Sequence, residues 1–232
     1  LVGGRYTTCV HTAAAYSPSP ELVVRGANYD LITRSAVQKM GPAMALPIGL
    51  VCGFAPQILT VWVGPQFAVL APLILLLTFH LSLNLAVLPL FSINVAYNQV
   101  RVPGVVTMLM GVVNITLAVA LPLLTGWGYY GVAAAGAIVL TLKNGFFTPW
   151  YATKVLGVDV QTFTPSILSG IFATILVGVA AGALNTLFDI ASLSMLVVYG
   201  TVVSLAYLLL SIRWVLMGMA DTRQELYTLK AQ

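Results

Sequence analysis

Six long stretches of apolar residues, almost free of charge, are the feature that most restricts the fold of this chain. A helix of about 20 apolar residues crosses the hydrocarbon core of a bilayer. Helices and closed barrels are the structures that satisfy their own backbone in lipid, and the alternating polar pattern of a barrel is absent from the sequence. The sequence therefore predicts an all-α integral membrane bundle of about six transmembrane helices, at residues 41–63, 67–97, 102–124, 129–150, 165–187 and 190–212.

The composition leads to the same fold class. Of the 232 residues, 59% are hydrophobic and 7% are charged, and the mean hydropathy is +0.98. An ordinary soluble domain with this composition would expose apolar surface, so we expect lipid to be the solvent for most of the chain. The apolar stretches leave no room for a separate soluble domain.

Three regions follow from this pattern. We expect residues 41–212 to form the six-span bundle and residues 213–232 to form a cytoplasmic C-terminal tail. Residues 1–40 are expected to hold the remnant of a preceding span and then a cytoplasmic amphipathic connector, which is either an interfacial helix on anionic lipid or a solvated linker. Because the chain begins with Leu1 rather than Met, we expect a processed or truncated product.

Lys and Arg residues fall on one side of the predicted bundle. They precede the first predicted span, lie between the second and third, flank the end of the fourth and follow the sixth, whereas the other three turns contain none. These residues are Arg25, Arg34, Lys39, Arg101, Lys143, Lys154, Arg213, Arg223 and Lys230. The tenth basic residue, Arg5, falls in the expected remnant of a preceding span, and its side is not assigned. Since positive residues are retained in cytoplasmic loops, we expect both ends of the bundle to be cytoplasmic. The net charge of +4 is scattered among loops, so it does not indicate a nucleic-acid partner.

A polar stripe marks the second predicted span. His80, Asn84, Asn94 and Asn98 belong to a series with alternating steps of four and three, which places them on one face of a helix. Pro89 interrupts the same segment. Such groups avoid lipid, so they either line a cavity or bond neighbouring helices. The imidazole of His80 is accordingly either a proton carrier or a structural hydrogen-bonding group.

Lys143, followed by Asn144, is the one fixed charge well inside a predicted span. It lies seven residues before Trp150, which is about 10 Å from the expected cytoplasmic boundary at helical rise. Two arrangements are open at this depth. The flexible stem either extends to the headgroups, or the ammonium faces an inner cavity, where it would attract an anionic group such as a phosphate.

Small residues indicate where helices pack. Gly170, Gly178 and Gly182 recur at multiples of four residues in the fifth predicted span, and Gly111 with Asn114 forms a similar face in the third. We expect these faces to be helix-packing surfaces, because small residues let helix backbones approach closely. The two cysteines and two histidines lack the spacing of a metal site, and no cofactor is expected.

Two blocks of the sequence resemble a known transporter family. They are ALPIGLVCGFAPQILTVWVGPQFAVLAPLILLL and NQVRVPGVVTMLMGVVNITLAVALPLLTGWGYYGVAAAGA, and they look like the second half of polysaccharide flippases of the multidrug/oligosaccharidyl-lipid/polysaccharide exporter superfamily. In that family a Trp-x-Gly-Pro-like turn precedes a long span, a basic cytoplasmic turn, an Asn-containing span and Gly-x-x-Gly-Ala-like text. The matching residues here are Trp62, Gly64, Pro65, Arg101, Asn114, Gly128, Gly131 and Val132, and the resemblance covers most of residues 20–155.

The resemblance implies a specific transport activity. Such flippases have two lobes of helices around a central cavity and carry lipid-linked oligosaccharides, usually on a polyprenyl pyrophosphate, across the bacterial inner membrane by alternating access. This chain would be a C-terminal fragment that supplies one lobe, because family members are considerably longer. Its partners would be membrane lipid, the lipid-linked sugar and a missing N-terminal lobe. Members of the family carry cationic residues in the cavity. The resemblance makes Lys143 the candidate for such a residue in this chain, with Arg101 as a peripheral one.

Three other functions remain as alternatives. A cation-coupled multidrug exporter of the same superfamily would need an intramembrane carboxylate, and no predicted span contains Asp or Glu. A membrane-embedded glycosyl or acyl transferase would need acidic or histidine pairs near one interface, whereas Asp159 and Asp189 are expected on opposite sides. We therefore do not expect an enzyme. A non-catalytic membrane assembly subunit would have its polar stripe wholly buried against other helices.

Overall fold

All regular structure in the described part of the chain is helical. In the computed structural model the backbone is described for residues 20–188, 190 and 192–230, and the side chains for residues 35–159, 161–188, 190 and 192–212. The helical segments are α1 (Pro20–Gly53), α2 (Ala55–Trp62), the 3-10 helix η1 (Pro65–Leu70), α3 (Ala71–Phe79), α4 (Leu81–Ala86), α5 (Leu88–Ala96), α6 (Arg101–Thr125), α7 (Tyr129–Leu142), the π turn η2 (Lys143–Phe147), α8 (Thr148–Leu156), the 3-10 helix η3 (Val160–Thr162), α9 (Thr164–Leu187) and α10 (Leu193–Lys230). The prediction of an all-α fold is confirmed.

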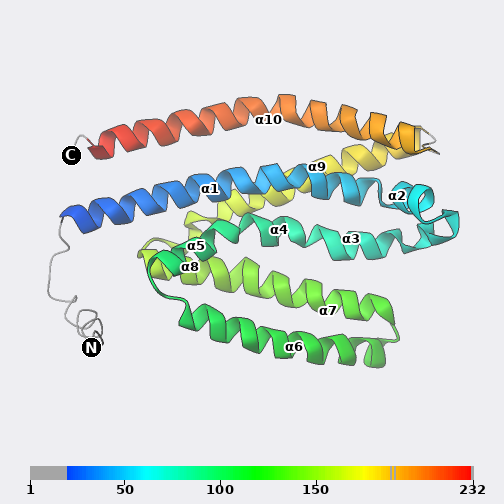
Figure 1. Cartoon of the computed structure of the whole chain (residues 1–232), viewed down its shortest axis with the longest axis horizontal. Helices are drawn as coiled ribbons and strands as arrows, with labels where there is room; N and C mark the ends of the chain where they lie inside the picture. Colours follow the sequence, from blue (N-terminus) through cyan, green and yellow to red (C-terminus); the bar gives the residue numbers. More distant parts are fainter. Residues whose placement is uncertain (1–19, 189, 191, 231–232) are drawn as a thin grey trace, which may run out of the picture.

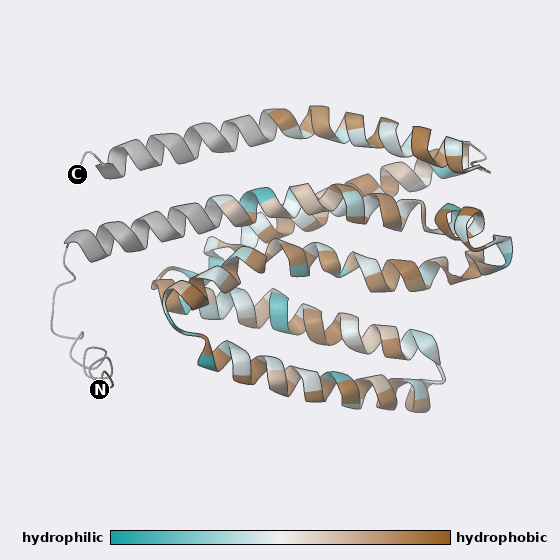
Figure 2. Ribbon diagram, in the orientation of Figure 1, coloured by the Kyte–Doolittle hydropathy of each residue, from teal (hydrophilic) through white to brown (hydrophobic). Residues whose placement is uncertain are grey.

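The number of membrane-crossing segments also agrees with the prediction. Within the described residues, five segments are long and apolar enough to cross a membrane: Pro65–Ala96, Arg101–Thr125, Tyr129–Leu156, Thr164–Leu187 and Leu193–Ile212. A sixth is formed if Ser35–Gly53 and Ala55–Trp62, which meet at an angle of 64°, count as one bent span. The described helices are hydrophobic over most of their length and are interrupted by few hydrophilic residues (Figure 2).

The helices lie side by side in the order α10, α1 with α9, α3 to α5, α7 with α8, and α6 (Figure 1). The broken segment Pro65–Ala96 thus lies between the α1–α9 pair and the segment that contains α7 and α8. At the far edge, α6 packs mainly on α7, and Pro103 is its one buried residue. At the opposite edge, α10 contacts α1, α2 and α9, and Tyr207 Oη donates a hydrogen bond of 2.8 Å to the carbonyl of Pro42.

The α1–α9 contact is the most extensive in the bundle, and glycines make it possible. A Cβ added at Gly170 would lie 2.7 Å from Gly41 Cα, and one added at Gly49 would lie 2.6 Å from Val177 Cβ. Further along, a Cβ on Gly178 would lie 3.5 Å from the Gly49 carbonyl oxygen. Helices approach this closely in membranes where small residues face each other, so this face of α9 is directed at α1.

Three proline-linked breaks divide the membrane segments. Pro56 lies in the first turn of α2, directly after the bend at Phe54, and Pro89 lies in the first turn of α5, directly after the break at Val87. A proline has no N–H to donate to the carbonyl four residues earlier, and its ring clashes with that carbonyl, so a proline favours an interruption of the helix in front of it. Pro149 stands in the same relation to the π turn that precedes it.

A further break, at His80, has no proline. The His80 imidazole Nδ1 lies 3.2 Å from the Leu76 carbonyl oxygen, the acceptor that the His80 N–H would use in a regular helix. The His80 N–H instead points to the Thr78 carbonyl, and α3 ends there. The ring therefore takes over a backbone acceptor at the point where the helix is interrupted.

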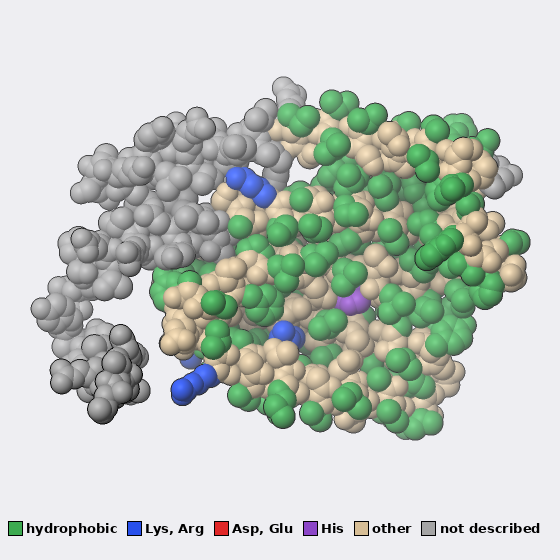
Figure 3. Space-filling view, viewed as in Figure 1, with side chains coloured by type: hydrophobic (Ala, Val, Ile, Leu, Met, Phe, Trp, Pro, Cys, Tyr) green, Lys and Arg blue, Asp and Glu red, His purple; other side chains and the backbone are tan. Residues whose placement is uncertain are grey.

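The two ends of the bundle differ in charge. The start of α1, the α5–α6 connection, the α8–α9 connection and the end of α10 lie at one end, and the α2–α3, α6–α7 and α9–α10 connections lie at the other (Figure 1). Lys and Arg side chains on the face in Figure 3 are confined to the half that contains the first of these ends. Apolar side chains cover the rest of this face, as expected for a surface in contact with lipid.

The expected regional boundaries do not coincide with helix ends. The helix α1 runs from Pro20 to Gly53 through the expected connector and into the first span, and α10 runs from Leu193 to Lys230 through the expected start of the tail. The expected remnant of a preceding span lies in residues 1–19, outside the described residues. The division into regions and the cytoplasmic placement of the basic end remain predictions.

Candidate functional site

Two broken membrane segments meet at a pair of asparagines. Asn144, in the π turn, donates a hydrogen bond of 2.9 Å from Nδ2 to Oδ1 of Asn84, in α4. The two residues are separated by 60 positions in the sequence, and both are buried, with 7% and 8% of their surface exposed. The structure thus brings together one residue from the predicted polar stripe and one from the predicted Lys143–Asn144 pair.

Lys143 is buried beside this contact. It is 8% exposed, and its Nζ lies 5.0 Å from the centroid of the Phe91 ring in α5. The apolar segment extends through α8 to Leu156, so Lys143 lies near the middle of the segment Tyr129–Leu156 rather than near its end. The side chain packs within the bundle rather than along its lipid-facing surface.

The π turn explains how Lys143 and Asn144 are presented. The Thr148 N–H bonds the Lys143 carbonyl, five residues earlier, and the Thr148 hydroxyl donates to the same carbonyl at 3.2 Å and to Asn144 Oδ1 at 3.3 Å. The wider turn precedes Pro149, which cannot donate to the carbonyl of Gly145. π turns of this kind occur frequently at functional sites. The π turn was not predicted from the sequence. Pro149 was the one residue whose position could have indicated an irregular turn.

No described carboxylate compensates the charge of Lys143. Asp159 is the one acidic residue whose side chain belongs to the described set, and its Oδ1 accepts a hydrogen bond from the Gln161 N–H. No ion pair to Lys143 is formed among the described residues, where its neighbour is the face of the Phe91 ring. Burying a charge without a partner is costly, and an ionisable residue inside the membrane therefore usually marks a functional site.

The cluster of Asn84, Lys143, Asn144 and Thr148 has more hydrogen-bond donors than acceptors available. Asn84 Oδ1 and Asn144 Oδ1 already accept hydrogen bonds, whereas the buried Asn84 Nδ2 has no partner within the described structure. The ammonium of Lys143 adds three N–H donors. Spare buried donors beside a positive charge suit an anionic oxygen or a dense group of hydroxyls. We call these four residues the donor cluster.

The other predicted cavity residues are placed apart from the donor cluster. Asn94 is buried in α5, and its Oδ1 has no partner in the described structure. Asn98 is exposed in the turn after α5 with φ of 54°, a left-handed conformation that asparagine tolerates. Arg101 is the exposed first residue of α6. The predicted stripe is therefore divided between the interior and one end of the bundle.

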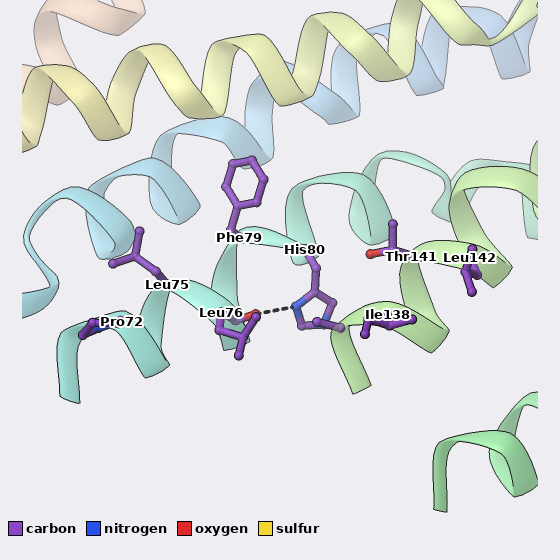
Figure 4. Close-up of a pocket in the computed structure, with 9 residues that line it drawn as sticks. Pro72, Leu75, Leu76, Phe79, His80, Ile138, Thr141 and Leu142 are labelled. Atoms are coloured by element: carbon purple, nitrogen blue, oxygen red, sulfur yellow. Dashed lines mark hydrogen bonds between the residues drawn. The ribbon is translucent and has the colours of Figure 1, made fainter. Parts of the chain in front are cut away.

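His80 lies on open grooves between α3 and α7. One groove of ≈ 620 Å³ is lined by the imidazole together with apolar side chains such as Phe79 and Ile138, and with Thr141 (Figure 4). A second groove, of ≈ 490 Å³, also includes His80 in its lining. His80 is half-buried, and its ring bonds its own helix through the Leu76 carbonyl.

Of the predicted packing residues in α6, one faces α7 and one does not. The Oδ1 of Asn114 is buried, and it lies 3.9 Å from the position of a Cβ added at Gly136 in α7. Gly111 is exposed, and a Cβ added there would meet nothing within 4 Å in the described structure. In contrast, Gly170, Gly178 and Gly182 of α9 all lie on the side that faces α1.

Comparison with known proteins supports placement in the membrane. No protein-family model matches the chain, and no solved structure matches it significantly. A curated relative from Bacillus subtilis (strain 168), described as the uncharacterized membrane protein EpsK, is 38% identical over 172 residues. The match covers 74% of this chain and 34% of the relative, so the chain spans about a third of that protein's length. The chain is thus homologous to part of a longer membrane protein.

Proposed function

We propose that this chain forms one lobe of a transporter that flips a lipid-linked oligosaccharide or polysaccharide precursor across the bacterial inner membrane by alternating access. The observation that carries the proposal is Lys143, buried in the middle of a membrane segment with no carboxylate partner among the described residues. The length of the homologous membrane protein supports the idea that a further lobe completes the transporter. The chemistry is movement of an intact molecule, with no covalent bond made or broken.

The donor cluster fits the polar part of such a substrate. A pyrophosphate oxygen would accept hydrogen bonds from the Lys143 ammonium and from Asn84 Nδ2, which has no partner within the described structure. The negative charge of the ligand would offset the cost of burying the ammonium. Sugar hydroxyls both donate and accept hydrogen bonds, so they also suit a surface rich in amides.

The apolar part of the substrate would remain in lipid. The α3–α7 grooves are lined almost entirely by apolar side chains, such as Leu75 and Leu142, and they are open. An isoprenoid chain beside the bundle would therefore lose no hydrogen bonds and expose no apolar surface to water. The polar head and the lipid tail would then move by different routes, the head between lobes and the tail along the bilayer.

Alternating access is supported by where the helices are broken. The π turn lies against α4, the short helix between the breaks at His80 and Val87. Membrane transporters commonly place their binding sites at discontinuous helices near the middle of the bilayer. We propose that rocking of this lobe against the other exposes the donor cluster first to one side of the membrane and then to the other.

The alternative functions have less support. An assembly subunit is predicted to bury its polar stripe completely, whereas Asn98 is exposed and His80 is half-buried. A cation-coupled multidrug exporter would need a carboxylate from outside the described side chains, in which the membrane segments contain none. The donor cluster offers positive charge, which favours an anionic substrate over a cationic drug.

The test is transport by the natural full-length protein in proteoliposomes. The substrate is a fluorescent oligosaccharide on polyprenyl pyrophosphate, and a membrane-impermeant quencher reports how much label has crossed. Lys143→Gln should lower the initial rate at least about tenfold, because a hydrogen bond to a charged group contributes about 1.5–3 kcal/mol. Lys39→Gln, which removes an exposed charge on α1, is the matched control and should keep the wild-type rate. A Lys143→Gln variant that transports at the wild-type rate would overturn the proposal.

A further inference from the structure

A polar pocket lies at the basic end of the bundle, between the α5–α6 connection and α8. Its volume is ≈ 380 Å³, and it is lined by Tyr97, Gln99, Val102, Tyr151, Lys154 and Val155. Four of these six side chains carry hydrogen-bonding groups, in contrast to the apolar α3–α7 grooves. We call this the α6–α8 pocket.

Lys154 supplies a positive charge to the α6–α8 pocket. Its side chain is exposed, and Nζ lies 5.4 Å from the centroid of the Trp150 ring, one helical turn earlier in α8. No ion pair to Lys154 is formed within the described part of the chain. The aromatic face holds the ammonium near the pocket without neutralising it, since a cation–π contact leaves the charge available to an anion.

Tyr151 adds a hydroxyl donor. The residue is 8% exposed, and its ring stacks on Phe147 with centroids 5.6 Å apart. Its hydroxyl forms no hydrogen bond with any described group, and the side chain lines the pocket. The hydroxyl is therefore available to donate a hydrogen bond to a ligand in the pocket. The exposed amide of Gln99 provides a further group at the opening.

The first turn of α6 contributes to the same pocket through Val102. Arg101 begins this helix, and Val100 at the N-cap position offers no side-chain hydrogen bond to the first backbone N–H groups. The N-terminus of a helix carries a partial positive charge and free N–H donors. Lys154, the Tyr151 hydroxyl, the uncapped turn and Arg101 therefore favour an anion at this end of the bundle.

We propose that the α6–α8 pocket binds the phosphate of an anionic phospholipid headgroup. The pocket lies where two membrane segments end, next to Trp150 and Tyr151, the aromatic residue types that occupy the membrane–water interface. Val102 and Val155 give it apolar walls that suit a glycerol backbone. Basic pockets between membrane helices recognise lipid headgroups in this way. Lys154 is eleven residues beyond Lys143, about 16 Å along the helix, so the proposal does not depend on the transport site.

The test is lipid binding by the natural full-length protein in phosphatidylcholine nanodiscs. Fluorescent phosphatidylglycerol is titrated, and quenching by the tryptophans or native mass spectrometry reports bound lipid. Lys154→Gln should weaken phosphatidylglycerol binding about fivefold, the effect of one basic residue near an anionic lipid. Lys39→Gln removes a charge outside the pocket and should change binding less than about twofold. Tyr151→Phe removes the hydroxyl alone and should also weaken binding, while labelled phosphatidylcholine binds all variants equally.

Two results would overturn this proposal. The first is equal loss of phosphatidylglycerol binding in Lys154→Gln and Lys39→Gln, which would show general attraction to the basic end rather than a pocket. The second is displacement of the lipid by millimolar inorganic phosphate, which would identify free phosphate as the ligand. Because Lys154 is exposed, Lys154→Gln should unfold at the wild-type temperature. A difference in bound lipid between this variant and the wild type then reports binding rather than stability.

Discussion

Asn144 in the π turn and Asn84 in α4 share a buried hydrogen bond of 2.9 Å that joins two interrupted membrane segments. Each asparagine lies beside a break in its own helix, so the contact fixes two irregular stretches of backbone against each other. Thr148 holds Asn144 from the other side through a bond of 3.3 Å to its Oδ1. The contact thus places the neighbouring Lys143 inside the bundle.

A double-mutant cycle should detect this contact. Asn84→Ala and Asn144→Ala should each destabilise the full-length protein, because each leaves the partner amide buried and unsatisfied, at a cost of about 1–3 kcal/mol. The double variant should lose less than the sum, with a coupling of about 0.6–1.7 kcal/mol, as for hydrogen bonds between membrane helices. Unfolding in mixed micelles with increasing dodecyl sulfate measures all four proteins. Strict additivity would show that the two amides do not interact.

Lys143→Met should separate function from stability. The substitution keeps an unbranched apolar side chain against Phe91 but removes a buried charge that has no described counter-ion. Replacing buried charges by apolar residues of similar volume is often neutral or stabilising. We expect an unfolding temperature equal to or above that of the wild type, together with loss of transport. A lower unfolding temperature would indicate that the ammonium has a structural partner.

The α1–α9 contact should be intolerant of small enlargements. Gly170→Ala places a Cβ within 2.7 Å of the Gly41 backbone, and overpacking of this kind costs about 1–3 kcal/mol. Gly111→Ala is the matched control, because a Cβ there meets none of the described atoms within 4 Å. Alanine is the better helix former by about 0.5–1 kcal/mol, so this variant should be neutral or slightly more stable. Comparable destabilisation by both variants, in the same micelle assay, would contradict this account of the packing.

Much of the fold follows from sequence, because hydrophobic length is a strong signal in a membrane protein. The spans begin and end close to the expected positions, and the small residues of α9 face α1. Local irregularities were harder to predict. The break at His80 depends on a side chain that takes over the Leu76 carbonyl. The π turn depends on Thr148, which bonds the Lys143 carbonyl, and on Pro149, which has no N–H to donate.

The candidate site was only partly foreseen. Periodicity placed Asn84, Asn94 and Asn98 on one helical face, but breaks at His80 and Val87 interrupt that helix, and Asn98 is exposed. The sequence pattern ended this span at Trp150, whereas the helical segment continues through α8 to Leu156. Contact between residues 60 positions apart depends on tertiary packing, which a single sequence does not reveal.

In the proposed transporter, Lys143 recognises the negative charge of a lipid-linked substrate. The most direct measurement compares the affinity of the full-length protein for an oligosaccharide on polyprenyl pyrophosphate with its affinity for the same oligosaccharide on an uncharged polyprenyl ether. The wild type should prefer the pyrophosphate at least about tenfold, and Lys143→Gln should lose most of that preference, because a charge-assisted hydrogen bond contributes about 1.5–3 kcal/mol. An equal preference for the pyrophosphate-linked oligosaccharide in the wild type and in Lys143→Gln would contradict this role of Lys143.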